Sequence, residues 1–167
     1  MDNTENLWKI YDNISELIRF SDAKAVAILA TNGVIAGFYF SNISALENAL
    51  KDSQIASIPL SVALFFVFIS GLSSAHCLFP RLKPDRECDA IFFFDIVNKH
   101  KTPEEYNKAV QESFLNDNSR LNSQLSCQIW QISKVAKRKY DLIKRSIGLL
   151  IVAVASSIAL ILIVALR

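Results

Sequence analysis

Glycine is scarce in this chain, with four residues among 167. Hydrophobic residues make up 51% of the sequence and charged residues 20%. A disordered chain is poorer in apolar side chains than this, so the composition excludes disorder along most of the length. The chain is long enough for one folded domain.

Charge of one sign is not in excess either. Eighteen basic residues stand against sixteen acidic ones, and the formal net charge of +2 does not suggest nucleic-acid binding. The first twenty residues are polar and acidic, without the basic start or small-residue cleavage site of a secretory signal peptide. The distribution of charge is more informative, because charge is absent from three stretches and dense beside them.

Cysteine and histidine are few and scattered. The three cysteines, Cys77, Cys88 and Cys127, are irregularly spaced without a CxxC pair. This argues against a disulfide framework or a structural zinc site and is compatible with a reducing cytosol. Motifs of the Walker, GxGxxG, HExxH and GxSxG types are also missing. We therefore predict no catalytic residues, no metal site and no enzyme activity.

Three long apolar stretches are present instead, at Ala25–Phe40, Ile55–Phe79 and Ser146–Leu166. About twenty apolar residues in a helix cross a bilayer core of roughly 30 Å. In the last stretch, Ser156 and Ser157 can return their hydroxyl protons to carbonyls of the preceding turn. The sequence therefore predicts an all-α integral membrane protein with three transmembrane helices.

The basic residues near the ends of these stretches predict the orientation of the chain. All the basic clusters fall on one side of the membrane if the N-terminus is cytosolic and the C-terminus periplasmic, and Arg167 alone lies on the far side. The predicted boundaries are a cytosolic N-terminal helix at 1–22, transmembrane helices at 23–43, 55–79 and 146–166, an external loop at 44–54, and a cytosolic segment at 80–145. The basic residues concerned are Arg19, Lys24, Arg81, Lys83, Arg86, Lys134, Lys137, Arg138, Lys139, Lys144 and Arg145.

The cytosolic segment is predicted to be mostly helical. Residues 90–97 suit either a short strand or an interfacial helix, and a helix should begin with Thr102 as N-cap and Pro103 in its first turn. After a turn at Asn116–Ser119, a second helix runs without a breaker into the last span. Its apolar positions follow heptad-like spacings of 4, 4, 3, 4, 4 and 3: Leu121, Leu125, Ile129, Ile132, Ala136, Tyr140 and Ile143.

The densest charge feature is the run KVAKRKYDLIKR before the last span. One interpretation is a positive flank that touches anionic lipid headgroups. The other is a helix face that holds a phosphate-bearing ligand, in which Arg81 and Arg86 join Lys139 and Tyr140. Phe92, Phe93, Phe94 and Tyr106 either stack on a base or pack in a core.

Several motifs taken in order resemble one family. Asp22-Ala23-Lys24-Ala25 opens the first span, Pro80-Arg81 closes the second, and the helix QIWQISKVAKRKYDLIKRS precedes the third. With Phe92-Phe93 and Glu105-Tyr106, this order resembles the Pycsar transmembrane effectors, small membrane proteins of a bacterial anti-phage system. The resemblance covers the chain from about Leu17 to the last span.

The resemblance implies an inner-membrane effector that works beside a pyrimidine nucleotide cyclase. Cyclic UMP or cyclic CMP made on infection would activate the effector, which then impairs the membrane in an abortive infection. A charge contact of Asp22 and Lys24 with Arg81 and the Lys139-Tyr140 helix would hold the resting state until a ligand rearranges it, although a snorkelling lysine and a helix N-terminal carboxylate are the simpler interpretation. A homo-oligomer is expected, because three spans with few polar faces do not form a pore alone.

Two other functions fit the same residues. The chain could be a membrane-anchored scaffold or signalling adaptor whose cytosolic helix binds a protein partner. It could also be a constitutive holin-like pore, which would be toxic without a signal. The three hypotheses differ in whether a cyclic pyrimidine nucleotide changes membrane potential.

Overall fold

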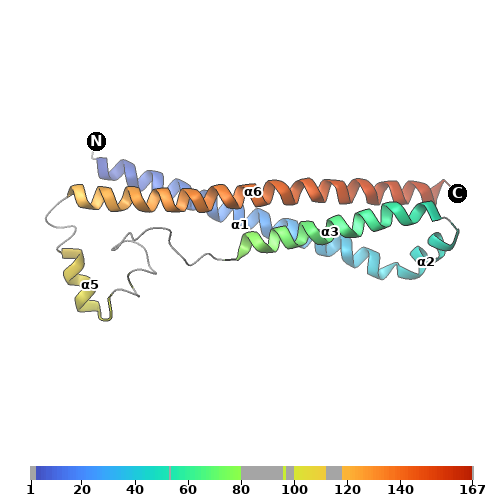
Figure 1. The fold of residues 1–167 in the computed structure, drawn as a ribbon, viewed down its shortest axis with the longest axis horizontal. Helices are drawn as coiled ribbons and strands as arrows, with labels where there is room; N and C mark the ends of the chain where they lie inside the picture. Colours follow the sequence, from blue (N-terminus) through green and yellow to red (C-terminus); the bar gives the residue numbers. More distant parts are fainter. Residues whose placement is uncertain (1–2, 53, 80–95, 97–99, 112–117, 167) are drawn as a thin grey trace. The chain divides into compact units, whose positions relative to one another are not determined.

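The computed structural model describes residues 3–52, 54–79, 96, 100–111 and 118–166. Its helices are α1 (Asn3–Ser41), α2 (Ile43–Asp52), η1 (Gln54–Ala56), α3 (Ser57–Leu78), α5 (Pro103–Val110) and α6 (Asn118–Ala165) (Figure 1). No strand occurs over these described ranges. Three of the helices, α1, α3 and α6, are long and apolar enough to cross a membrane, which confirms the predicted fold class.

The chain divides into two compact units, and α1 and α6 contribute to both of them. Unit 1 comprises Met1–Phe20 and Pro80–Arg138, and unit 2 comprises Ser21–Phe79 and Lys139–Arg167. Unit 2 therefore contains the apolar parts of all three long helices. Unit 1 contains the beginnings of α1 and α6 together with α5.

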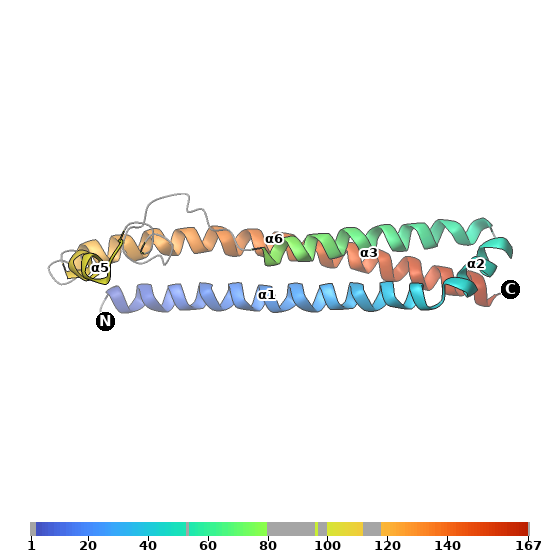
Figure 2. The ribbon, with the colours of Figure 1, turned by 90° about the horizontal axis from the view of Figure 1, so that it is seen from below.

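In unit 2, α1 and α6 run in the same direction and α3 runs opposite to both. Asp22 pairs with Lys139 and Tyr39 with Ser157, so partners on α1 and α6 are 117 and 118 residues apart along the chain. On α3, Ser70 contacts Asn32 of α1. The views in Figures 1 and 2 agree that α3 lies beside the later parts of α1 and α6. This alternation is the arrangement expected of three consecutive spans.

Small and aliphatic side chains fill the contacts between the helices of unit 2. One buried cluster joins Ala25 and Ile28 of α1 to Cys77 of α3 and Ile143 of α6. A second contains Tyr39, Ala56, Ala63 and Leu160. Small residues let membrane helices approach closely, and this close contact provides the van der Waals attraction that associates them in lipid.

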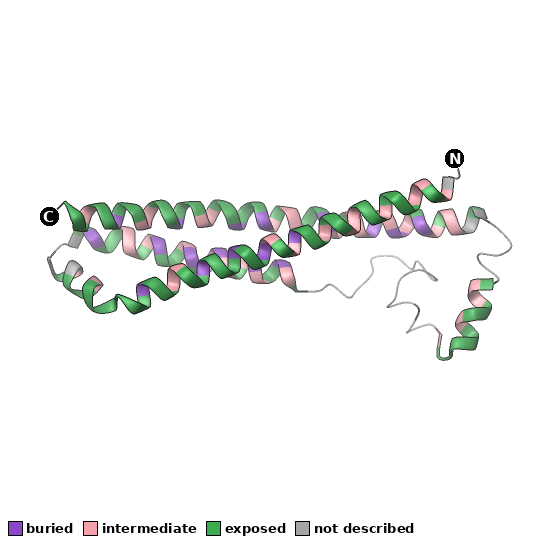
Figure 3. Ribbon diagram, turned by 180° about the vertical axis from the view of Figure 1, so that it is seen from behind, coloured by how far each residue is buried: buried purple, intermediate pink, exposed green. Residues whose placement is uncertain are grey.

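The outward faces of unit 2 are apolar. Val34, Phe40, Phe68 and Ile151 are among many large hydrophobic side chains that lie exposed, at 73%, 74%, 66% and 63% of their maximal area. Figure 3 shows the exposed class along the outer surfaces of the helices. In water this would be an aggregating surface, whereas in a bilayer it is the surface that lipid tails cover.

The connection between α1 and α3 is more ordered than its prediction as an external loop suggests. Residues 44–54 contain most of α2 and the start of η1. Leu46 and Leu50 of α2 pack against the cluster around Tyr39, while Glu47 and Lys51 form an exposed ion pair of 2.8 Å. Apolar and charged residues each separated by one helical turn explain why this short segment is helical.

The helix starts in unit 1 follow their sequence signals. The N–H of Glu105 donates to Thr102 Oγ1 at 3.2 Å, and Pro103 occupies the first turn of α5, which confirms the predicted cap. Thr4 Oγ1 of α1 donates to Asn122 Oδ1 of α6 at 2.8 Å. Helix α6 begins at Asn118, within the turn predicted at Asn116–Ser119, while residues 116–117 and all of 90–97 except Ile96 lie outside the described residues.

The heptad-like seam of α6 is confirmed, because every one of its seven positions is buried or half-buried. Cys127 corrects one expectation. It is disulfide-bonded, whereas Cys77 is a buried free thiol. The spacing of cysteines along a chain does not reveal which ones tertiary folding brings within bonding distance.

Candidate functional site

An ion pair joins α1 to α6 where the charged part of each helix meets its apolar part. Lys139 Nζ donates to Asp22 Oδ1. The side chain of Lys139 is 15% exposed and that of Asp22 is 38% exposed. A lysine ammonium with so little exposure needs an anionic partner, because burial of an unpaired charge is costly. Asp22 supplies that partner.

Two further contacts surround the ion pair. Lys24 Nζ lies 5.9 Å from the centre of the Tyr140 ring, within cation–π range. The thiol of Cys77, near the end of α3, donates to the backbone carbonyl of Lys139 at 3.8 Å. All three long helices therefore meet at this point. We call Asp22, Lys24, Lys139 and Tyr140 the charged cluster.

The structure thus brings together four of the six site residues named from the sequence. Asp22 and Lys24 were predicted to hold the resting state, and Lys139 and Tyr140 to bind ligand. The other two predicted ligand residues, Arg81 and Arg86, lie outside the described residues. Proximity alone does not test any of these roles, which stay predictions.

A second polar site lies within the apolar part of unit 2, where Asn32 of α1, Ser70 and Ser74 of α3 and Ser146 of α6 meet. We call these four residues the polar layer. They are 0% to 4% exposed. Asn32 Nδ2 donates to Ile28 O and to Ser70 Oγ, both at 3.0 Å.

The serines of the polar layer tie α3 to α6 by reciprocal bonds. Ser70 Oγ donates to Ser146 O at 3.0 Å, and Ser146 Oγ donates to Ser70 O at 2.8 Å. Ser74 Oγ and Ser146 Oγ lie 2.6 Å apart. Such bonds between membrane helices contribute on average about 0.6 kcal/mol each. The polar layer therefore links all three long helices.

Sequence reasoning missed the polar layer. Asn32 is conspicuous as an amide within an apolar run, whereas serines such as Ser74 are common in membrane helices. An intramembrane amide is by itself a signal of a helix–helix or functional contact. What the sequence does not contain is the rotation of each helix, which decides whether these polar groups face one another.

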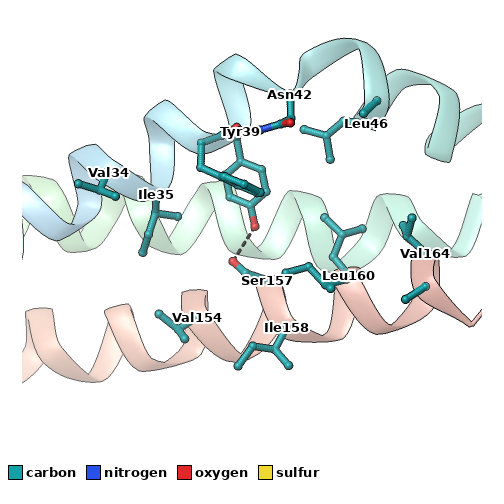
Figure 4. A pocket seen from close by; sticks show the side chains of 14 residues that line it. Val34, Ile35, Tyr39, Asn42, Leu46, Val154, Ser157, Ile158, Leu160 and Val164 are labelled. Carbon is teal, nitrogen blue, oxygen red and sulfur yellow. Dashed lines mark hydrogen bonds between the residues drawn. The ribbon is translucent and has the colours of Figure 1, made fainter.

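An apolar cavity of about 560 Å³ lies at the far end of the spans, between α1, the start of α2 and α6 (Figure 4). Val34, Ile35, Leu160 and Val164 are among its lining residues. At its wall Tyr39 donates its hydroxyl proton to Ser157 Oγ at 2.6 Å, and Ser157 passes its own to Ala153 O at 2.8 Å. The predicted return of serine hydroxyls to the preceding turn is thereby confirmed, since Ser156 likewise donates to Val152 O.

Comparison with known proteins decides the family. The model of the Pycsar effector protein domain matches residues 6–166 of the chain. This chain belongs to the Pycsar effector family. The match runs through both units and all three long helices, so it covers the charged cluster and the polar layer alike.

Two named relatives are similar to this Pycsar effector. The Pycsar effector protein SaPycTM of Staphylococcus aureus is 28% identical over 132 residues, covering 79% of this chain and 77% of the relative. The Pycsar effector protein PtPycTM of Propioniciclava tarda is 24% identical over 152 residues, covering 87% of this chain and 72% of the relative. No solved structure matches.

The family is that of the transmembrane effectors of an anti-phage system, and the three apolar helices are consistent with a membrane location. Two of the motifs that suggested this family at the sequence level meet in the charged cluster. Asp22 and Lys24 belong to the first motif, and Lys139 and Tyr140 belong to the last one. Residues of two motifs that are far apart in the sequence are thus in contact in the structure.

Proposed function

We propose that this Pycsar effector is activated by a cyclic pyrimidine mononucleotide, cyclic UMP or cyclic CMP, and then impairs the bacterial inner membrane in an abortive infection. The observation that carries the proposal is the continuity of α6, which runs from Asn118 to Ala165 without interruption. Its first half is polar and heptad-like, and its second half is an apolar span. A ligand that moves the first half therefore moves the span, because a helix transmits displacement along its axis.

The charged cluster is where we propose that the ligand phosphate acts. Lys139 already binds an anion, the carboxylate of Asp22. A cyclic phosphate carries the same charge and can replace that carboxylate. Arg81 and Arg86 stay ligand residues predicted from the sequence alone. Tyr140 offers a ring against which a base can stack. Displacement of Asp22 would release α1 from α6 at the ends of the spans.

The remaining parts of the proposal follow from the layout of the chain. The N-terminus is cytosolic and the C-terminus periplasmic, which places the charged cluster on the side where a cyclase releases its product. The effector is not an enzyme and needs no cofactor. Its partners are the bilayer, further copies of itself, and a pyrimidine nucleotide cyclase that acts through its product without a requirement for direct contact.

The proposal is tested in inverted membrane vesicles from cells that contain the effector and no cyclase. Cyclic UMP, cyclic CMP and, as a purine control, cyclic AMP are added separately while membrane potential is followed with a fluorescent dye. We expect one pyrimidine nucleotide to collapse the potential and cyclic AMP to leave it unchanged. Absence of depolarisation with both pyrimidine nucleotides, at confirmed effector levels, would contradict the proposal.

A matched pair of variants ties the response to the charged cluster. Lys139→Met should abolish the response, since the phosphate loses its cationic partner, whereas Lys137→Met on the exposed side of the same helix should not. Thermal stabilisation of the detergent-solubilised protein by the active nucleotide provides a direct measure of binding. If the nucleotide raises the thermal stability of both variants equally, Lys139 does not bind the ligand.

A further inference from the structure

The cavity between α1, the start of α2 and α6 has almost wholly apolar walls. Its two hydroxyl groups already use their hydrogens, because Tyr39 donates to Ser157 Oγ and Ser157 donates to Ala153 O. A cavity with such walls stays dry and takes an apolar ligand. Its volume of about 560 Å³ lies within the range of about 300 to 1,000 Å³ that ligand pockets occupy.

The cavity opens on the apolar exterior of unit 2. Several of its lining side chains are themselves exposed, among them Val34 at 73%, Phe38 at 58% and Ile158 at 53%. In a bilayer, side chains at this surface face the acyl chains of lipids. An acyl chain can therefore enter the cavity from the side without passing through water.

The depth of the cavity corresponds to one leaflet of the bilayer. Val154 and Ala165, which line it on α6, lie eight and nineteen residues beyond Ser146, where the last span is predicted to begin. At about 1.5 Å of rise per residue, the cavity extends from about 12 Å to about 28 Å into the span. Since the bilayer core is roughly 30 Å thick, the cavity occupies the leaflet remote from the charged cluster.

The dimensions of the cavity suit a single acyl chain and not a helix. Its wall from Val154 to Ala165 is about 16 Å long at the helical rise per residue. A helix about 10 Å in diameter would need roughly 1,200 Å³ over that length, which is about twice the volume of the cavity. An acyl chain is one methylene wide and packs at carbon–carbon distances of about 4 Å, so it fits lengthwise.

The two ends of the cavity differ in polarity. Figure 4 shows Val34 and Val154 at one end and Leu46 and Val164 at the other. Asn42 lines the second end, at the junction of α1 and α2. Its Nδ2 donates one amide hydrogen to Phe38 O at 2.9 Å, and the amide has a second hydrogen that an ester carbonyl of a lipid can accept.

We propose that the cavity binds one acyl chain of a phospholipid from the leaflet remote from the charged cluster. The glycerol ester lies at Asn42, and the end of the chain lies at Val34 and Val154. The chain contacts α1 and α6 together, so the bound lipid is part of the interface between these helices. This site requires no nucleotide and does not rest on the proposed function.

The site is tested by photolabelling of the full chain in vesicles of phosphatidylethanolamine and phosphatidylglycerol. A small fraction of the phospholipid has a photoreactive diazirine at the end of one acyl chain, and labelled residues are identified by mass spectrometry after irradiation. We expect several-fold more label at Val34 and Val154 than at Phe68 and Ile151. The last two residues are 66% and 63% exposed but lie outside this cavity, and they report ordinary contact with lipid.

A second probe tests the direction of the chain in the cavity. When the diazirine is placed next to the glycerol ester instead, the label should move to Asn42 and Leu46. Label from the ester-end probe at Val34 and Val154 would contradict the proposed direction, because it would place the headgroup near the middle of the bilayer.

A matched pair of variants tests whether the chain occupies the cavity itself. Val154 lines the cavity and Val152 does not, and both valines are 40% exposed on α6. Val154→Phe should fill part of the cavity and abolish the excess label at Val34 on α1. Val152→Phe should leave that excess unchanged.

Every other result overturns the lipid site. Equal labelling of Val34, Phe68 and Ile151 in the wild-type protein means that the cavity has only ordinary contact with lipid. Weaker labelling of Val34 than of Phe68 means that protein, such as a second copy of this chain, covers the cavity. If Val154→Phe fails to insert into vesicles, the wild-type labelling pattern decides alone. The assays contain no nucleotide, so the proposed function stands or fails separately.

Discussion

At the scale of single residues, the ion pair between Asp22 and Lys139 can be broken by an anion that competes with Asp22 for the Lys139 ammonium. Asp22 is more than a third exposed, so solvent screens part of its attraction for Lys139. Such a pair contributes about 1 kcal/mol or less to stability. That is too little to determine the fold, yet about 1 kcal/mol changes a two-state population roughly fivefold. The ion pair is therefore strong enough to shift the equilibrium between resting and active effector towards the resting state.

Removal of the carboxylate should raise basal activity. Asp22→Asn loses the attraction that holds α1 to α6, so we expect nucleotide-free depolarisation to increase by about fivefold. Dye-monitored membrane potential in cells that lack the cyclase is the measurement. The charge-swapped double variant Asp22→Lys with Lys139→Asp should return the basal rate towards that of wild type.

Asp141→Asn provides the control for this prediction, since Asp141 is an exposed carboxylate two residues beyond Lys139 on α6. It should leave the basal rate unchanged. If Asp22→Asn depolarises membranes at the wild-type rate both with and without nucleotide, the ion pair does not hold the resting state and only anchors the helices at the membrane surface.

At the scale of helices, α6, like α1, contributes to both units. It has 48 residues, and its polar and apolar halves have no break between them. The seam positions from Leu121 to Ile143 keep one side buried, while positions such as Lys137 and Lys144 are exposed. Coupling between the two halves should therefore depend on the integrity of the backbone more than on any one exposed side chain.

Interruption of α6 should uncouple ligand binding from depolarisation. Lys137→Pro removes a backbone hydrogen bond and clashes with the preceding turn, at a cost of about 3 kcal/mol in a helix interior. We expect this variant to insert into membranes and to be stabilised by nucleotide, but not to depolarise vesicles. Lys137→Ala, which keeps the helix, should behave as wild type. A full response from Lys137→Pro would show that continuity is unnecessary.

At the scale of the whole molecule, the apolar exterior of unit 2 requires a membrane. Large hydrophobic side chains lie exposed on α1, α3 and α6, and these helices are long enough to span. The alternating directions of the three helices place the two ends of the bundle on opposite sides of the bilayer. The distribution of lysine and arginine then predicts which side is cytosolic.

The orientation is tested with reporter fusions to the full chain. Green fluorescent protein fluoresces in the cytosol, and alkaline phosphatase becomes active only after export. We expect fluorescence from a fusion at the N-terminus and phosphatase activity from a fusion at the C-terminus. The reverse pair of fusions should be silent. Phosphatase activity at the N-terminus would invert the topology and move the charged cluster away from cytosolic nucleotide.

Local patterns determined much of this protein from the sequence alone. Charge-free stretches of about twenty residues predict spans because lipid admits little else. Thr102 and Pro103 predict a helix start because the cap and the fixed proline backbone act within one turn. The seam from Leu121 to Ile143 predicts a buried side because helical periodicity repeats every few residues. Each of these signals is read within a short window of the chain.

Contacts between distant residues were decided only by the tertiary structure. Asp22 meets Lys139 across 117 residues, and Asn32 meets Ser70 across 38. Such contacts depend on the rotation and axial register of packed helices, which hydropathy does not contain. The sequence therefore determined which segments cross the membrane, and packing decided which of their polar groups meet.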